Sequence, residues 1–441
     1  MAPSTPWPMI RMKCALLAIG LAAIPVLADA DQASPFSDTL TGDWGGWRTD
    51  LHNAGIDFNF GYVSETASNV QGGPMQGTRY TDQFTFGTTL DLDKLLSLNH
   101  AQFQFTITDR NGRNLSSDLH LDSLQQVQEV FGRGQTWRTT QFWYEQSYLD
   151  GALDLKLGRL TEGEDFASFS CEFMNLTFCG APPGNIVGSY WYNWPVSQWA
   201  TRVKASFPDF GYAQIGVYQV NPTYLTPAGS FNLGNPPGTT GALIPVEVAW
   251  LPTFGGSEQL QGSYKLGAWY NSSETADPVE NTQGQLLAIA GGQPLLHNGA
   301  WGWYLNFQQK LMNVSPDPDR GISAFLNMTF ADHRTATLDS QIAMGLFYTG
   351  PFDSRPIDQI GVAIGRTHVN GRVAQSQEAQ NAAGLGPVGV QYSEYASEIY
   401  YQFHVQNGFY LQPNLQYVHN PGGISQNTDD IILGLKAVIN F

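Results

Sequence analysis

The segment Gln83-Phe-Thr-Phe-Gly-Thr-Thr-Leu90 alternates between polar and apolar side chains. Phe84, Phe86 and Leu90 fall on one face of an extended chain, and Gln83 falls on the other. Because successive side chains of a strand point to opposite faces of a sheet, this period of two predicts a β-strand with one apolar face. Similar segments of about ten residues recur roughly 16 times, and ten residues is the length with which a strand crosses a membrane. They include residues 101–108, 153–158, 202–207, 264–268, 322–328, 342–346, 399–403, 411–417 and 431–441.

The connections between these segments differ in length. Tight turns follow Leu149, Pro208 and Gln406. A transmembrane barrel alternates short periplasmic turns with long external loops, whereas a soluble sandwich has no reason to do so. The sequence therefore predicts an all-β fold, a transmembrane antiparallel β-barrel of about 16 strands with short periplasmic turns and long extracellular loops. The predicted loops are the long polar stretches at residues 110–136, 161–197, 221–241, 272–299 and 367–392.

The composition supports this fold class. Only 13% of the 441 residues are charged, about half the usual share of a soluble domain. Aromatic residues make up 13% of the chain, which argues against disorder. The net charge of −17 argues against a nucleic-acid-binding protein, which needs basic patches. A barrel of about 16 strands is too wide for its own side chains to fill, so we expect an apolar face toward lipid and a polar face around an aqueous channel.

The N-terminus has the pattern of a cleaved signal peptide. Arg11 and Lys13 precede an apolar stretch over residues 14–27, and Ala28-Asp-Ala30 matches a cleavage site. A single membrane anchor is the alternative, but the stretch is shorter than the ~20 residues of a membrane span and Pro25 interrupts it. We expect a signal peptide over residues 1–30, a periplasmic segment over residues 31–55 and the barrel over residues 56–441.

Two further features fit export to the outer membrane. In an oxidising compartment, the remaining cysteines Cys171 and Cys179 are expected to form a disulfide. A metal site is the alternative, but no histidine lies near them in sequence. The chain ends in an alternating strand from Ile431 to Phe441. This strand looks like the one by which the barrel-assembly machinery recognises outer-membrane barrels, although any β-protein can end in a strand.

A wide barrel needs a constriction to be selective, and the groups that line it then decide what passes. Strand phase places Arg110, Trp143 and Glu145 on the lumen side, and Arg79 lies at the end of the first loop. Aromatic rings beside charged hydrogen-bonding groups suit sugars, which have both hydroxyls and apolar C–H faces. The alternative is that these charges merely solvate the lumen wall.

The long stretch 161–197 is a candidate to fold inward as a restriction element. Arg159 opens it, and it contains Glu164, the cysteine pair and Trp194. Several carboxylates lie together in it, and glycosidases use paired carboxylates, but spacing along the chain does not place them at catalytic separation. No G-x-S-x-G or H-E-x-x-H motif is present. We therefore predict a channel with no cofactor and no metal rather than an enzyme.

Several motifs, spread from the start of the mature chain onward, resemble those of the OprB family of carbohydrate-selective porins. The resemblance covers nearly all of the mature chain, and the motifs are more specific together than Asp-Trp-Gly-Gly is alone. They are Leu40-Thr-Gly-Asp-Trp-Gly-Gly-Trp-Arg48, Asp50–Ile56, Thr108–Ser116, Leu157–Leu160, Glu164–Ser168, Cys171–Cys179 and Tyr192–Trp199.

The resemblance implies a 16-stranded outer-membrane porin for the passive diffusion of glucose and similar monosaccharides. It also implies that basic, acidic and tryptophan groups near the constriction meet the sugar. The matching positions are Arg48, Arg110, Asn114, Arg159, Glu164 and Trp194, whereas Arg79, Trp143 and Glu145 rest on strand phase alone.

The sequence is also compatible with other functions. A general or anion-selective porin for sugar acids such as gluconate would use the arginines to attract carboxylates. An outer-membrane hydrolase would need a nucleophile and a base within hydrogen-bond reach. A secreted soluble β-protein would need no detergent for extraction. The expected partners are a sugar, outer-membrane lipids and the assembly machinery acting on the Phe441 strand, with a homo-oligomer as a further possibility.

Overall fold

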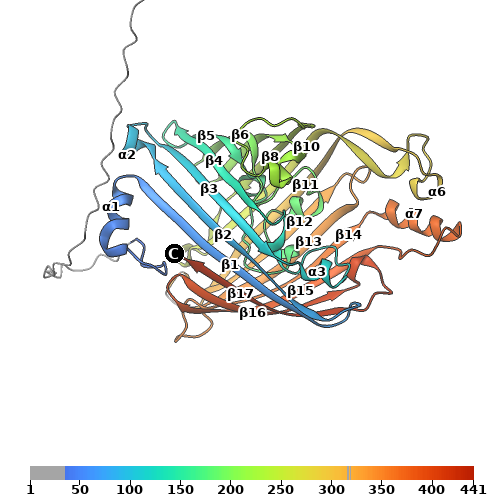
Figure 1. Ribbon diagram of the computed structural model, residues 1–441. Helices are drawn as coiled ribbons and strands as arrows, with labels where there is room; N and C mark the ends of the chain where they lie inside the picture. The colour runs from blue at the N-terminus through green and yellow to red at the C-terminus, as the bar shows by residue number, and fades with distance from the viewer. Residues whose placement is uncertain (1–34, 315–316, 318) are drawn as a thin grey trace, which may run out of the picture. The chain divides into compact units, whose positions relative to one another are not determined.

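The computed structural model describes residues 35–314, 317 and 319–441. These residues form a closed antiparallel barrel of 16 strands, which confirms the predicted fold class (Figure 1). Each strand of the wall pairs with its neighbours along the chain, and the last pairs with the first, so that Ile439 lies opposite Tyr62. The predicted signal peptide lies outside the described residues.

The strands of the wall are β1 (Ile56–Gln71), β2 (Gly77–Asp91), β3 (Ala101–Gly112), β4 (Trp137–Tyr148), β5 (Leu153–Leu160), β6 (Gln198–Phe207), β7 (Gly211–Val220), β8 (Gly241–Trp250), β10 (Leu260–Asn281), β11 (Pro294–Asn313), β12 (Gly321–Ala331), β13 (Leu338–Thr349), β14 (Gln359–Val369), β15 (Ser393–Gln406), β16 (Phe409–His419) and β17 (Asp430–Asn440). The two-residue strand β9 (Thr253–Phe254) pairs with β10 in the turn after β8.

The α-helices are short and lie in the connections or before β1. They are α1 (Trp47–Asn53), α2 (Leu92–Leu96), α3 (Leu115–Asp118), α4 (Glu162–Asp165), α5 (Pro182–Ile186), α6 (Leu287–Ala290) and α7 (Gly371–Ala382). The 3-10 helices are η1 (Trp44–Gly46), η2 (Glu129–Phe131), η3 (Leu176–Phe178), η4 (Pro222–Leu225), η5 (Pro227–Gly229), η6 (Gly256–Glu258) and η7 (Pro421–Gly423). No helix in the described part of the chain is both long and apolar enough to cross a membrane.

Two of the predicted loops contain longer regular elements than the short helices of the other loops. β10 and β11 continue as a paired hairpin through most of residues 272–299 and leave a connection of only residues 282–293. Figure 1 shows this hairpin projecting past the neighbouring strands. The polarity of this stretch was misleading, because a hairpin that projects from a barrel needs no apolar face. The predicted loop 367–392 contains α7, whose start is capped by the Asn370 side chain.

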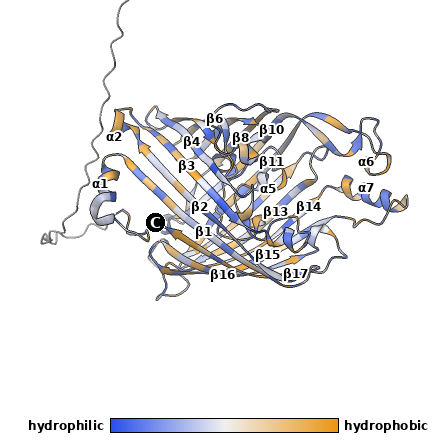
Figure 2. Ribbon diagram, in the orientation of Figure 1, coloured by the Kyte–Doolittle hydropathy of each residue, from blue (hydrophilic) through white to orange (hydrophobic). Residues whose placement is uncertain are grey.

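The apolar side chains of the wall point outward. Leu326, Met344 and Ile364 are neighbours across three strands. Met344 and Ile364 are about half exposed, whereas the adjacent Ala343 and Ala363 on the opposite face are buried. Figure 2 shows the same alternation of hydropathy along most strands. The wall therefore presents an apolar surface to its surroundings.

Part of the lumen is filled by the connection 161–197, the candidate restriction element. The connection 161–197 folds inward and packs against side chains of β7, β8, β10 and β11. Its Trp191 is fully buried, with ring centroids 5.5 Å from Trp269 and 6.2 Å from Tyr304. The strands alone cannot fill a barrel of this width, but a long loop supplies the missing packing.

Candidate functional site: the lumen constriction

The connection 161–197 reaches the opposite wall of the barrel. The connection begins with α4, directly after β5, and its middle contains the disulfide between Cys171 and Cys179. The predicted disulfide is therefore confirmed, and the metal alternative is not supported, since the two sulfur atoms are bonded to each other beside Glu129. The Asn175 amide donates to the Gln416 side chain of β16 at 3.0 Å. The loop thus crosses the lumen from β5 to β16.

A second inward connection, residues 113–136, meets this loop. Arg133 donates from the second connection to the backbone carbonyls of Gly188 at 2.7 Å and Trp191 at 3.2 Å. Because a guanidinium carries several donors in one plane, it can hold two carbonyls of the neighbouring loop together. The two connections therefore form one constriction.

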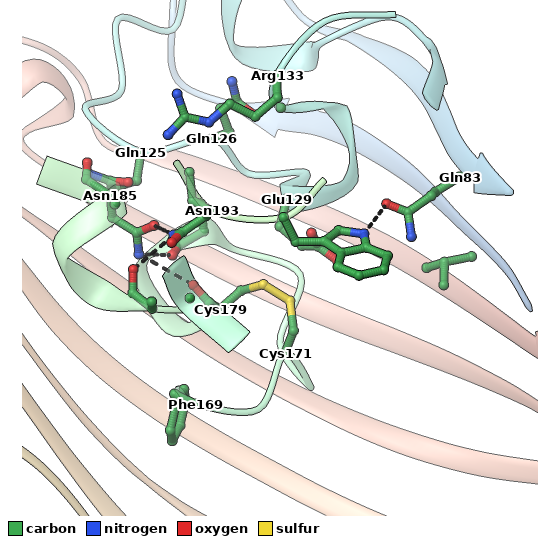
Figure 3. Close-up of a pocket in the computed structure, with 18 of the residues that line it drawn as sticks. Gln83, Gln125, Gln126, Glu129, Arg133, Phe169, Cys171, Cys179, Asn185 and Asn193 are labelled. Carbon is green, nitrogen blue, oxygen red and sulfur yellow. Dashed lines mark hydrogen bonds between the residues drawn. A yellow bond between two sulfur atoms is a disulfide. The ribbon is translucent and has the colours of Figure 1, made fainter. Parts of the chain in front are cut away.

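A cavity of about 850 Å³ lies between these two loops and the wall (Figure 3). Its polar lining comes from both loops and from β2, β3 and β17, and its aromatic lining comes from three rings. The polar and charged lining residues are Gln83, Arg110, Gln125, Gln126, Glu129, Arg133, Glu164, Ser168, Asn185, Asn193 and Lys436, and the rings belong to Phe169, Trp194 and Tyr410.

Arg110 is held rigidly on β3. Its Nε donates to Gln83 Oε1 at 2.8 Å, and one terminal nitrogen donates to the Gly132 carbonyl at 2.8 Å. The other terminal nitrogen lies 3.8 Å from a carboxylate oxygen of Glu129. Arg110 is only 5% exposed. The predicted inward direction of Arg110 is confirmed, and its charge is paired within the lining.

Two amide oxygens of the lining have no partner. Asn193 donates to the Ala181 carbonyl at 2.9 Å, but its Oδ1 has no hydrogen bond among the described residues. The Oε1 atom of Gln126 is also buried without a partner within the described chain. The Trp194 indole donates to Gln83 at 3.2 Å, drawn as a dashed line in Figure 3. Since buried acceptors normally find a donor, each of these two side chains keeps an unused acceptor oxygen at the cavity.

The three acidic residues that begin the loop face different partners. Glu164 lines the cavity and accepts from Gln141 at 2.5 Å and from Thr161 at 2.7 Å. Burial raises the pKa of the Glu164 carboxyl to about 7, while Lys156 acts against the shift. Glu162 is fully buried against Gln198, and Asp165 lies 3.1 Å from the Lys156 ammonium. Glu162 and Asp165 are absent from the cavity lining, so the lining does not present a pair of carboxylates from this segment.

Arg48 does not line the cavity. It donates to the main-chain oxygens of Phe441 at 2.9 Å and Phe58 at 3.0 Å, and to Thr39 at 3.0 Å. Its guanidinium also lies over the Phe36 ring at 4.3 Å. Arg48 therefore joins the N-terminal segment to the seam between β1 and the end of β17, and the expected contact with sugar has no support in this placement.

Arg159 is also outside the lining. It lies opposite Phe142 and Trp199 in the wall and shares the phase of the outward-facing Leu157. Its guanidinium donates to the Ser197 and Asn232 carbonyls and lies 4.1 Å from the centroid of the Tyr224 ring. The connection 221–240 thus covers Arg159, which supports the rim rather than the cavity.

The remaining predicted residues lie outside the lining. Arg79 donates to Asp118 at 2.6 Å, and the Asn114 side chain caps α3, so both stabilise the connection 113–136. Trp143 lies under the Lys156 ammonium at 4.3 Å. Glu145 pairs with Arg202. None of these four residues lines the cavity, whereas Arg110, Glu164 and Trp194 do.

Four further lining residues were not predicted: Gln126, Arg133, Asn193 and Lys436. The first three lie in polar loops, where no period marks which side chain faces the lumen. Lys436 does carry a signal, because it falls on the polar phase of the terminal strand between Leu435 and Ala437.

The known proteins that this chain resembles are porins. A family model described as "Carbohydrate-selective porin, OprB family" matches residues 75–441. The chain is 43% identical to Porin B of Pseudomonas aeruginosa over 443 residues, which cover 97% of each chain. It is 34% identical over 420 residues to "Putative porin QuiX" of Acinetobacter baylyi, with 91% of this chain and 93% of that protein covered. The high-pH structure of Pseudomonas putida OprB matches with a TM-score of 0.89 and 43% identity, over 92% of this chain and 99% of that one.

Proposed function

This chain belongs to the OprB family of carbohydrate-selective porins, and we propose that it carries glucose and similar monosaccharides by passive diffusion through the constriction. The protein is a carbohydrate channel of the bacterial outer membrane rather than an enzyme, and its apolar outer wall lies in lipid. We further propose that residues 31–55 and the short turns face the periplasm and that the assembly machinery reads the Phe441 strand.

The observation that carries the proposal is the mixed lining of the cavity. The Trp194 and Phe169 rings offer faces for the C–H groups of a sugar, and the unpartnered oxygens of Asn193 and Gln126 offer acceptors for its hydroxyls. Because these contacts are few, binding stays weak enough for release, which diffusion through a channel requires.

The charges of the lining favour a neutral sugar over a sugar acid. Arg110 is paired with Glu129, and Lys436 lies 3.5 Å from Glu129 and 3.7 Å from Glu65. Arg133 is occupied by two carbonyls. A sugar carboxylate would meet the Glu164 carboxylate in the same cavity, and the two like charges would repel each other.

The test is single-channel current of the purified protein in a planar bilayer, titrated with glucose and then with gluconate. We expect saturable block by glucose and weaker block by gluconate. Trp194→Ala should raise the half-blocking glucose concentration about tenfold, since a buried aromatic contact is worth about 1.4 kcal/mol. Trp199→Ala is the matched control, because Trp199 lies outside this cavity. Block by gluconate alone would establish an acid-selective pore instead, and block unchanged by Trp194→Ala would remove Trp194 from the site.

A further inference from the structure

Two lumen-facing glutamates of β15 hold the two inward loops. Glu394 and Glu398 are four residues apart on the same face, and each is 2% exposed. Glu398 accepts from the backbone N–H groups of Met174 at 2.9 Å and Asn175 at 2.8 Å. These two donors belong to the disulfide-closed part of the connection 161–197.

Glu394 makes the corresponding contacts with the other loop. It accepts from the backbone N–H groups of Leu124 at 2.6 Å and Gln125 at 3.3 Å. It also accepts from the N–H of Gly422, in the connection between β16 and β17, at 2.9 Å. One strand therefore anchors both loops of the constriction, each through one carboxylate.

These contacts are strong and cannot be replaced locally. A carboxylate that accepts two N–H groups forms charge-assisted hydrogen bonds, about twice as strong as neutral ones. The loop N–H groups held in this way have no strand partner, so loss of the carboxylate would leave them buried and unpaired. Of the anchored residues, Leu124 and Gln125 line the cavity themselves, and Asn175 directly precedes the lining residue Leu176.

A cation on the neighbouring wall completes the arrangement for the disulfide loop. Lys436 of β17 donates to the carbonyls of Cys171 at 3.0 Å and Phe173 at 3.4 Å. Glu398 therefore binds N–H groups at residues 174 and 175 while Lys436 binds carbonyls at residues 171 and 173. Both the N–H groups and the carbonyl groups of this segment are therefore bound to the wall. These bonds fix the position of the segment along the barrel axis and its distance from the wall.

On this basis we propose that Glu394 and Glu398 are positioning residues that set the aperture of the pore and thereby its preference for sugar. They touch no cavity surface themselves; they act by holding the two loops that carry Gln125, Gln126, Asn185 and Asn193. The part of the proposal that concerns sugar rests on the proposed function, whereas the part that concerns the aperture does not.

The experiment compares Glu398→Gln, Glu398→Asp and Glu394→Gln with the wild-type protein in planar bilayers. The aperture is measured by the size of polyethylene glycol that still enters the channel, and sugar binding by the half-blocking glucose concentration. Gln keeps only one acceptor oxygen, and Asp keeps the charge but shortens the reach by one methylene group. We expect all three variants to admit larger polymers and to raise the half-blocking glucose concentration about tenfold, the change that loss of one sugar contact to a displaced loop would cause.

The matched control is Gln402→Ala. Gln402 lies four residues beyond Glu398 on the same face, bonds to Gln412 and is not part of the cavity lining. It should leave both measurements unchanged. Heat-modifiable migration on gels confirms that each barrel is folded, and Glu394→Gln and Glu398→Gln test separate loops if one variant does not fold.

The outcomes separate the two proposals. If Glu398→Asp behaves as the wild type and only Glu398→Gln differs, the effect is one of lumen charge and the positioning role is refuted. Unchanged polymer cut-off in all three variants also refutes it. If the wild type shows no glucose block but the variants still admit larger polymers, the aperture role stands and the proposed substrate fails.

Discussion

Arg110 and Arg159 were both predicted to lie at the constriction, but their side chains lie on different sides of the barrel wall. Arg110 falls on the polar phase of β3 and lines the cavity, whereas Arg159 falls on the apolar phase of β5 under the connection 221–240. We expect Arg110→Ala to raise the half-blocking glucose concentration about tenfold, since a charge-assisted donor is lost. Arg159→Ala should leave glucose block unchanged and lower the free energy of unfolding by about 1–3 kcal/mol, because buried carbonyls lose their donor.

The check is bilayer current for block and urea unfolding in lipid vesicles for stability. Equal loss of block in both variants would contradict the different placement of the two side chains.

Glu164 makes the charge of the pore depend on pH near neutrality. Burial raises the pKa of its carboxyl to about 7, so it is neutral below that pH and ionised above it. We expect the preference for K⁺ over Cl⁻, measured by reversal potential, to rise as pH increases from about 5.5 to about 8.5. Because the folded pKa is raised, ionisation opposes folding, and the contribution of Glu164 to stability falls as pH rises from about 4.5 to about 7.

Glu164→Gln should remove the part of the pH dependence of selectivity that lies near pH 7. Glu280→Gln is the control, because Glu280 lies on the projecting hairpin and pairs with Arg372. An unchanged titration in Glu164→Gln would assign the effect to other groups.

At the level of elements, the N-terminal motif (residues 40–48) packs on the seam where β1 pairs with β17. The Asp43 side chain accepts from the backbone and hydroxyl of Thr49, and Trp44 stacks on Phe60 with centroids 6.3 Å apart. Gly46 has a φ of +99°, a conformation that favours glycine and lets the chain turn into α1. The motif therefore supports barrel closure rather than sugar contact.

Removal of Arg48 should weaken this closure. We expect Arg48→Ala to lower the free energy of unfolding by about 2 kcal/mol or more, since hydrogen bonds from a buried charged group to three oxygens are lost. Arg113→Ala is the control, because Arg113 is 67% exposed at its side chain and its partner Asp118 also binds Arg79, so it should change stability by less than about 0.5 kcal/mol. Urea unfolding in vesicles measures both. If Arg48→Ala instead alters glucose block, Arg48 takes part in sugar binding in the pore.

Elements that have one face in lipid could be predicted, and elements without such a face could not. The alternation from Gln83 to Leu90 lies within β2 as predicted, because one face is apolar and the other polar. The ends of β10 and β11 escaped prediction, because a projecting hairpin carries no such contrast. In the site, phase placed Arg110 correctly, but the contact of Glu398 with Met174 joins residues 224 apart, and no local period encodes that distance.

At the scale of the whole molecule, the barrel depends on a continuous apolar outer band. Met344 lies near the middle of β13, is 49% exposed and is flanked in register by Leu326 and Ile364. A lysine near the bilayer midplane costs about 2–4 kcal/mol on a lipid-facing strand, because lipid offers no partner for the charge. We therefore expect Met344→Lys to lower the free energy of unfolding by about that amount. Leu385→Lys, at a 52% exposed position in the connection after α7, should change it by less than about 0.5 kcal/mol. Unfolding in vesicles of defined thickness measures both, and equal effects would mean that β13 does not face lipid.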